Sequence, residues 1–345
     1  MGLAANGGDM DDLTTGKRNK RGDWVPGAPL VTSPLFRLPP QLAKLPGWLP
    51  GYFLPWNVLF MVTGAVFWTW FFPDVAVMAN WHWGWVLHIL ALNLIAATLF
   101  YSALEIPLYL KRRQANRFKY NGKFPGDTPN PAFWFGSQNA EGILRSLGTG
   151  VPVWTAFQCL IGWSAANGYG LTLTFAENPL YLLALGFCVP IWHEFHFYCV
   201  HRLIHTPFLY KHIHSVHHHS VNPSPWSSLS MHPVEQALYF SSCLIHLLIP
   251  SNPIVALYGL HYAGFGAVVG HIGFDKIELT EGRGLDTHAY THYLHHKHFE
   301  VNYGDGLMPL DRLFGSWHDG TAAGDAATEA RFKAKVARVN RPKAA

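Results

Sequence analysis

WHEFHFYCVHRLIHTPFLYKHIHSVHHHS, residues 192–220, comes directly after an apolar run and is crowded with histidine. Within it, HRLIH places His201 and His205 four residues apart, and HSVHH places His214, His217 and His218 at positions i, i+3 and i+4. Residues at these spacings share one face of a helix. The stretch therefore predicts helices that present imidazole groups at the end of an apolar segment.

A third box repeats this spacing further along the chain. HYLHH contains His292, His295 and His296, and His271 stands alone in GHIGFD between the boxes. Eight box histidines and His271 exceed the four ligands of a single structural zinc site. Imidazole is a ligand for iron, zinc and copper alike. The count therefore favours two metal ions and leaves the element open.

The composition favours lipid rather than water as the main solvent. Hydrophobic residues make up 49% of the 345 residues and charged residues only 13%, whereas soluble domains carry about 25% charged residues. A net charge of +4 gives no indication of nucleic acid binding. The four cysteines lie in apolar segments without a C-x-x-C pair, which is typical of small buried hydrophobic residues.

Apolar segments follow one another along the chain, and a membrane span needs about 20 such residues. The candidate segments are residues 54–72, 85–110, 151–171, 180–200, 234–249 and 253–270. Threaded in this order from a cytosolic N-terminus, the loops on the far side contain no Lys or Arg, as the positive-inside rule requires. The basic run KRRQANRFK at 111–119 is then interpreted as a solvated flank. A set of buried helices in a large soluble protein is the rival interpretation.

These observations predict an all-α integral membrane helical bundle of about four to six membrane segments with a cytosolic histidine-rich helical cap. Three regions are expected. Residues 1–50 form a flexible N-terminal arm and surface segment, residues 51–320 the membrane catalytic domain, and residues 321–345 a basic C-terminal tail.

The motifs HRLIH, HSVHH, HPVE, GHIGFD, HYLHHKHFEVNYG and DRLFGSW occur in this order over about residues 180–317. They resemble those of the fatty acid hydroxylase/sterol desaturase superfamily. The resemblance implies a membrane-bound di-iron oxidoreductase that uses O2 and electrons from a separate redox protein, such as cytochrome b5 or a ferredoxin with its reductase. The metal ligands that it implies are His201, His205, His214, His217, His218, His271, His292, His295 and His296.

Other positions are expected to support these ligands or to add one. They are His232 in HPVE, His288 four residues before His292, Asp275, and Asn302 in NYG. Asp275 occupies the position at which the fatty acid 2-hydroxylases have a second histidine, so the chain looks more like the sterol-type branch. His193 and His196 depart from the residues that the resemblance leads us to expect before the first box.

The expected function is O2-dependent hydroxylation or desaturation of a C–H bond in a membrane lipid, of sterol or fatty acyl type. Two Fe ions are the expected cofactors, with Zn as a substitute in purified samples. The alternative is a metal-dependent membrane lipid hydrolase that needs no O2, although HEFHF at 193–197 does not match H-E-x-x-H. A metal transporter or sensor is the third hypothesis. The expected location is a bacterial inner membrane or the endoplasmic reticulum, with the active site facing the cytosol.

Overall fold

The computed structural model describes residues 15–37, 39–280 and 283–339, and helices dominate these residues. The parts of the expected N-terminal arm and C-terminal tail at residues 1–14 and 340–345 lie outside them. The helices of the first half are α2 (Leu45–Phe53), α3 (Trp56–Val66), α4 (Val75–Met78), α5 (Trp83–Glu105), α6 (Gln138–Arg145) and α7 (Val151–Ala166). Those of the second half are α8 (Pro179–Ile204), α9 (Pro207–Leu209), α10 (Ser215–His218), α11 (Pro233–Phe240), α12 (Ile245–Leu248), α13 (Pro253–Gly270), α14 (Tyr290–His298), α15 (Leu310–Leu313) and α16 (Ala322–Val339). Two antiparallel hairpins pair β1 (Gly16–Arg18) with β2 (Trp24–Pro26), and β3 (Lys276–Thr280) with β4 (Arg283–Asp286).

Three helical stretches in the described part of the chain are long and apolar enough to cross a membrane. They are Trp83–Leu110, Pro179–Ile204 and Pro253–Gly270, and the bent pair Leu42–Phe53 and Trp56–Phe71 is a fourth if it forms one span. The prediction of a helical membrane bundle is therefore confirmed, with three or four candidate spans where about four to six were expected. Residues 151–166 form α7, which has only 16 residues, and the apolar run 234–249 is divided among α11, a 3-10 turn and α12.

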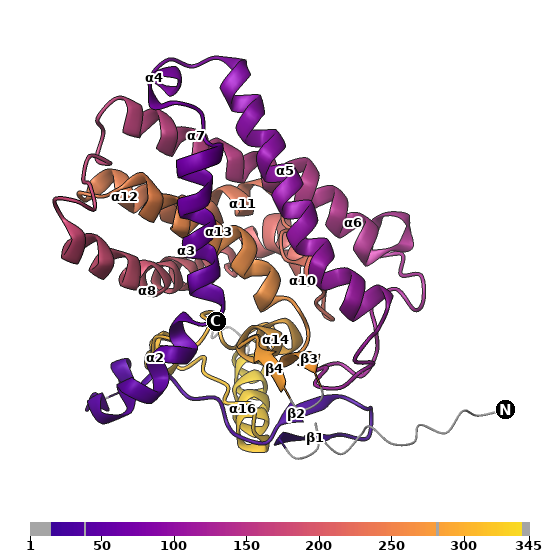
Figure 1. Cartoon of the computed structure of the whole chain (residues 1–345). Helices are drawn as coiled ribbons and strands as arrows, with labels where there is room; N and C mark the ends of the chain where they lie inside the picture. The colour runs from indigo at the N-terminus through magenta and orange to yellow at the C-terminus, as the bar shows by residue number, and fades with distance from the viewer. Residues whose placement is uncertain (1–14, 38, 281–282, 340–345) are drawn as a thin grey trace, which may run out of the picture.

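Helix α13 lies at the centre of the bundle and packs against α3, α7 and α8 (Figure 1). Asn252 begins it by accepting a hydrogen bond from the Ile254 N–H, and Pro253 occupies the first turn, where no N–H is needed. Two glycines allow the close contacts with α3 and α7. A Cβ at Gly64 would lie 2.8 Å from the Tyr258 nitrogen, and one at Gly264 would lie 2.7 Å from the Trp154 ring.

The two hairpins, α14 and α16 gather at one end of the bundle, the lower end in Figure 1. A second apolar cluster that includes Trp24, Tyr120 and Phe274 holds this end together. The interpretation of KRRQANRFK as a solvated flank is wrong for Gln114, Phe118 and Lys119, which are buried. Lys119 is fully buried and lies above three aromatic rings. Its backbone also bridges to Phe274, so the segment forms part of the packed end.

The ends of three helices bring the boxes to this end of the bundle. His201 lies in the last turn of α8 and His205 is its C-terminal cap, because Pro207 makes a helical conformation unfavourable at Thr206. His271 caps α13 at its C-terminus, and α14 carries the third box. The second box lies on the short helical turn Tyr210–His214 and on α10.

Candidate metal centre

The eight box histidines and His271 assemble into two neighbouring groups, each with ligand atoms close enough to share one ion. The first group contains five residues and the second contains four. They are His201, His205, His214, His218 and His295 in the first, and His217, His271, His292 and His296 in the second. The second and third boxes each contribute histidines to both groups. The two groups therefore depend on the same two segments of the chain.

The nitrogen atoms within each group are spaced like the ligands of a single ion. The Nε2 atoms of His205, His218 and His295 are 3.0–3.2 Å apart. In the second group, the His271 Nε2 lies 3.1 Å from the His217 Nε2 and 3.1 Å from the His292 Nε2. Metal–imidazole bonds of about 2.0–2.1 Å place neighbouring ligand atoms about 3 Å apart.

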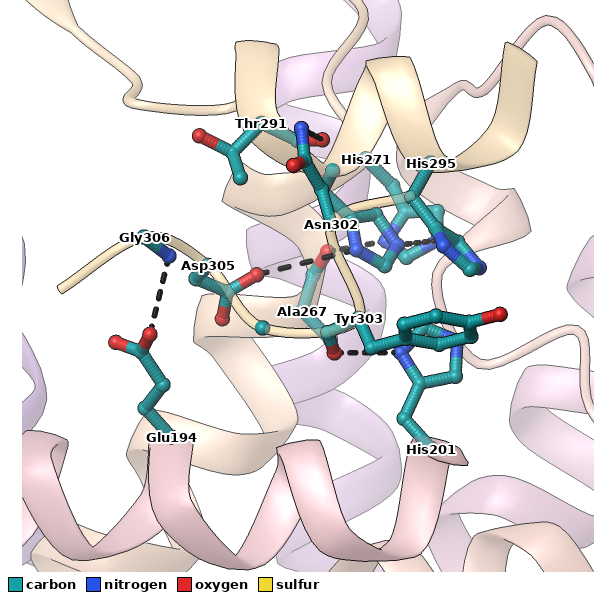
Figure 2. Close-up of polar contacts among 12 residues, drawn as sticks. Glu194, His201, Ala267, His271, Thr291, His295, Asn302, Tyr303, Asp305 and Gly306 are labelled. Atoms are coloured by element: carbon teal, nitrogen blue, oxygen red, sulfur yellow. Dashed lines mark hydrogen bonds and ion pairs between the residues drawn. The ribbon is translucent and has the colours of Figure 1, made fainter. Parts of the chain in front are cut away.

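Backbone carbonyls fix the outer nitrogen of several rings. The Nδ1 of His201 donates to the Tyr303 carbonyl at 2.8 Å, and the Nδ1 of His295 donates to the Val301 carbonyl at 2.7 Å. His271 donates in the same way to the carbonyl of Ala267, at 2.9 Å (Figure 2). A carbonyl only accepts, so each of these Nδ1 atoms carries the proton and each Nε2 presents a lone pair.

This tautomer makes the centre unfavourable without a cation. His217 donates from Nδ1 to the Ser230 carbonyl at 3.4 Å, so its Nε2 and that of His271 face each other with two lone pairs at 3.1 Å. Protonation does not resolve the conflict, because burial lowers the pKa of His271 to about 4 and, with the neighbouring His201, lowers that of His205 to about 2. A metal ion between the lone pairs does resolve it. The donor set therefore fits a pair of transition-metal ions bound by nitrogen.

One carboxylate completes the support of the ligands and was missed by the sequence analysis. Glu235 accepts from the Nδ1 of His214 at 2.7 Å, and both side chains are buried. The signal for it is the acidic residue of HPVE, the motif in which His232 was expected to support the site. A carboxylate behind a metal-binding imidazole orients the ring and increases its basicity.

The loop after α14 is held against the centre by buried side chains. Asn302 bonds the backbone N–H and carbonyl of His318 at 2.8 and 3.0 Å. Asp311 accepts from the N–H groups of Tyr303 and Gly304. Glu194 of α8 accepts from the N–H of Gly306 (Figure 2) and from those of residues 307 and 308. This loop supplies the carbonyls that His201 and His295 use, so Asn302 supports the centre without belonging to either histidine group.

Besides Asn302, three positions were expected to support the ligands or to add one, and all three lie outside the two histidine groups. The Nδ1 of His232 accepts from the Val234 N–H and caps α11. His288 is exposed, and Asp275 accepts a hydrogen bond from the Tyr120 hydroxyl at 3.0 Å. Asp275 and His288 do line the large cavity described next.

A cavity of about 890 Å³ extends to the histidines from the N-terminal segment and α2. Its wall includes His201 and His214 of the first group and His217, His271 and His292 of the second. Apolar and aromatic side chains of α3, α8, α11 and α13 form much of the rest. This volume lies in the upper part of the range of small-molecule sites, about 300–1,000 Å³. The cavity gives an apolar molecule access to both groups of histidines.

Comparisons with known proteins agree with this geometry. Residues 186–316 match the family model described as fatty acid hydroxylase. A Delta(7)-sterol 5(6)-desaturase of Gibberella zeae is 29% identical over 44% of this chain and 40% of its own length, and one of Aspergillus fumigatus is 26% identical over 67% of this chain and 75% of its own. A putative methylsterol monooxygenase of Dictyostelium discoideum is 31% identical over 41% of this chain and 54% of its own.

The matched region spans only about two fifths of the first sterol desaturases, 40% and 39% of their lengths. No solved structure matches the chain significantly. The matched residues nevertheless contain all nine histidines of the two groups. Residues 186–316 therefore match the fatty acid hydroxylase family, and the homologues of the chain include sterol desaturases and a putative methylsterol monooxygenase.

Proposed function

We propose that this protein is an O2-dependent di-iron oxygenase that hydroxylates or desaturates a C–H bond of a membrane lipid of sterol or fatty acyl type. One observation carries the proposal. Imidazoles from three boxes and His271 form two adjacent groups at the end of an apolar cavity. The proposed ligands are the five histidines of the first group and the four of the second.

Iron is the proposed metal because the family performs redox chemistry. When bound, two iron ions would supply the activation of O2 that the oxidation of an unactivated C–H bond requires. Zinc binds similar nitrogen ligands with higher affinity than ferrous iron, so it is expected to replace iron in some purified samples. The nitrogen-only donor set by itself suits both elements.

The side chains of the protein have three tasks in this proposal. The carbonyls of residues 267, 301 and 303 hold the rings of His271, His295 and His201 with each Nε2 turned inward. Burial excludes water from the two groups and keeps the imidazoles neutral. The cavity holds the lipid beside His201 and His292, so that one carbon is presented to the centre.

The stoichiometry implies a partner. Hydroxylation consumes one O2, two electrons and two protons and yields the alcohol and one water, and desaturation with the same inputs yields the alkene and two waters. A separate redox protein of the cytochrome b5 or ferredoxin type, with its reductase, is the proposed electron source. We place the protein in a bacterial inner membrane or the endoplasmic reticulum as a multi-pass protein whose centre faces the cytosol.

The test compares lipid turnover with and without O2. Purified, iron-loaded protein is supplied with a membrane lipid extract and reductant, and products are identified by mass spectrometry. The expected products gain one oxygen from ¹⁸O2 or lose two hydrogens, and they form only in aerobic samples. Lipid cleavage that proceeds equally without O2 and reductant would instead identify the protein as a metal-dependent hydrolase.

A further inference from the structure

His193 is a buried polar side chain of α8 that belongs to neither histidine group. It is only 4% exposed, and its Nδ1 has no hydrogen-bond partner among the described residues. A buried imidazole nitrogen without a partner is unfavourable, and most such groups in proteins are satisfied. The described residues therefore leave a nitrogen of this ring unsatisfied, and the ring borders the large cavity.

His193 borders two cavities. It lines the large cavity and also a second, apolar cavity of about 210 Å³ between α8, α12 and α13. Three aromatic rings surround the imidazole at centroid distances of 4.9 to 6.2 Å, namely those of Tyr262, Tyr239 and Phe197. An apolar molecule in the large cavity thus passes a single imidazole set in an aromatic wall.

His193 is aligned with the metal centre along one helix face. His193, Phe197 and His201 follow at intervals of four residues, which places them on the same side of α8. The helical rise of 1.5 Å per residue separates His193 from His201 by about 12 Å along the axis. A ligand bonded to His193 would therefore have its polar group about two helical turns from the His201 end of the cavity.

The charged side chains that line the cavity favour a neutral group beside His193. Asp305 lines the cavity with 43% of its side chain accessible and lies 3.9 Å from the Nδ1 of His292. Glu194, next to His193 in sequence, also lines the cavity, and its oxygens accept from backbone N–H groups. The basic side chains of the lining, Arg37 and Lys44, lie on the N-terminal segment before α2. A neutral hydroxyl group, which can donate and accept, matches an imidazole among carboxylates better than a carboxylate or phosphate does.

We propose that His193 is a specificity-determining residue that hydrogen-bonds the hydroxyl group of a neutral lipid in the large cavity. The contact sets how far the lipid enters, and hence which carbon lies at the histidine groups. This inference rests on the proposed function only in taking a lipid as the ligand of the cavity.

The test measures equilibrium binding to metal-loaded protein in detergent, without O2 and without reductant. The probes are radiolabelled cholesterol against cholestane, and 1-octadecanol against octadecane and stearate. We expect the hydroxyl compound to bind about tenfold more tightly than its hydrocarbon in at least one pair, and more tightly than stearate. His193→Phe should abolish this preference and retain the hydrocarbon affinity, and His193→Gln should keep part of it.

His196→Phe is the matched control, because His196 lies on the same helix and bonds Ser241. It should leave the preference unchanged. The proposal is overturned if wild type binds hydroxyl compound and hydrocarbon equally, if stearate binds best, if no probe binds, or if His193→Phe keeps the preference. Because no turnover is measured, these outcomes are independent of whether the iron centre oxidises lipids.

Discussion

The Nδ1 of His214 lies 2.7 Å from a carboxylate oxygen of Glu235, and both side chains are almost completely buried. The Nε2 of the same ring lies 3.2 Å from that of His201 in the first histidine group. Glu235 of α11 thus binds the nitrogen of the His214 ring that points away from the first histidine group, and so fixes the orientation of this ring.

Glu235→Ala should lower the affinity of the first group for its ion by about 10- to 100-fold, because the His214 ring loses its orienting partner. Glu235→Gln keeps an acceptor oxygen and should lose less. Competition with a chelator measures both affinities. Glu329→Gln on the exposed surface of α16 is the control. Equal metal affinities in wild type and Glu235→Ala would contradict this role.

Asn302 should contribute to stability through its side chain rather than through its backbone alone. It has a φ of 48° and bonds the backbone of His318 through both its amide nitrogen and its oxygen. Asn302→Gly removes the bonds and tolerates the positive φ, whereas Asn302→Ala removes the bonds and adds strain. Each should lower the free energy of unfolding by about 1–3 kcal/mol, with Ala the more harmful. Unchanged thermal unfolding of both variants in detergent would show that these bonds contribute nothing.

Glu194→Gln should loosen the loop that borders the cavity. The carboxylate accepts from the N–H groups of Gly306, Leu307 and Met308 at 2.9–3.0 Å. Glutamine retains one acceptor oxygen and turns a donor toward the remaining N–H groups. Limited proteolysis should cut within residues 304–309 several times faster than in wild type. Glu177→Gln, at an exposed position before α8, is the comparison, and equal cleavage rates in all three proteins would refute the prediction.

Acid should destabilise the metal-free protein. Burial lowers the pKa of His271 to about 4, whereas an unfolded histidine titrates near 6.5. The unfolded state therefore binds more protons as pH falls from about 6.5 to about 4, and stability is lost over this window by about 1.4 kcal/mol per pH unit for each such histidine. Urea unfolding between pH 7 and pH 5 measures the slope, which His271→Asn should reduce. A slope of zero would mean that these histidines are not buried in the neutral form.

The spacing of the boxes was sufficient to predict their helical conformation. The i, i+3, i+4 pattern of His292, His295 and His296 became one face of α14, because that spacing has a single helical interpretation. The distribution of the second box between two histidine groups was not predictable. His214 and His218 join the first group and His217 the second, which depends on how α10 meets α14 and the end of α13.

Two other features show where sequence patterns are ambiguous. The apolar run 234–249 looked like a short span, yet it forms broken helices within the bundle, and composition alone does not separate these cases. In HPVE, Pro233 begins α11, so His232 remains outside the helix as its cap while Glu235 lies in the first turn and reaches His214. Only the tertiary contact reveals which of the two supports a ligand.

The most direct measurement is the iron content of anaerobically purified, iron-replete protein, together with its lipid oxidation. Wild type should hold two irons per chain. His295→Ala, in the first group, and His292→Ala, in the second, should each retain membrane insertion, lose turnover and lose one iron. One iron or none in wild-type protein that oxidises lipid at its full rate would contradict a centre built from two ions.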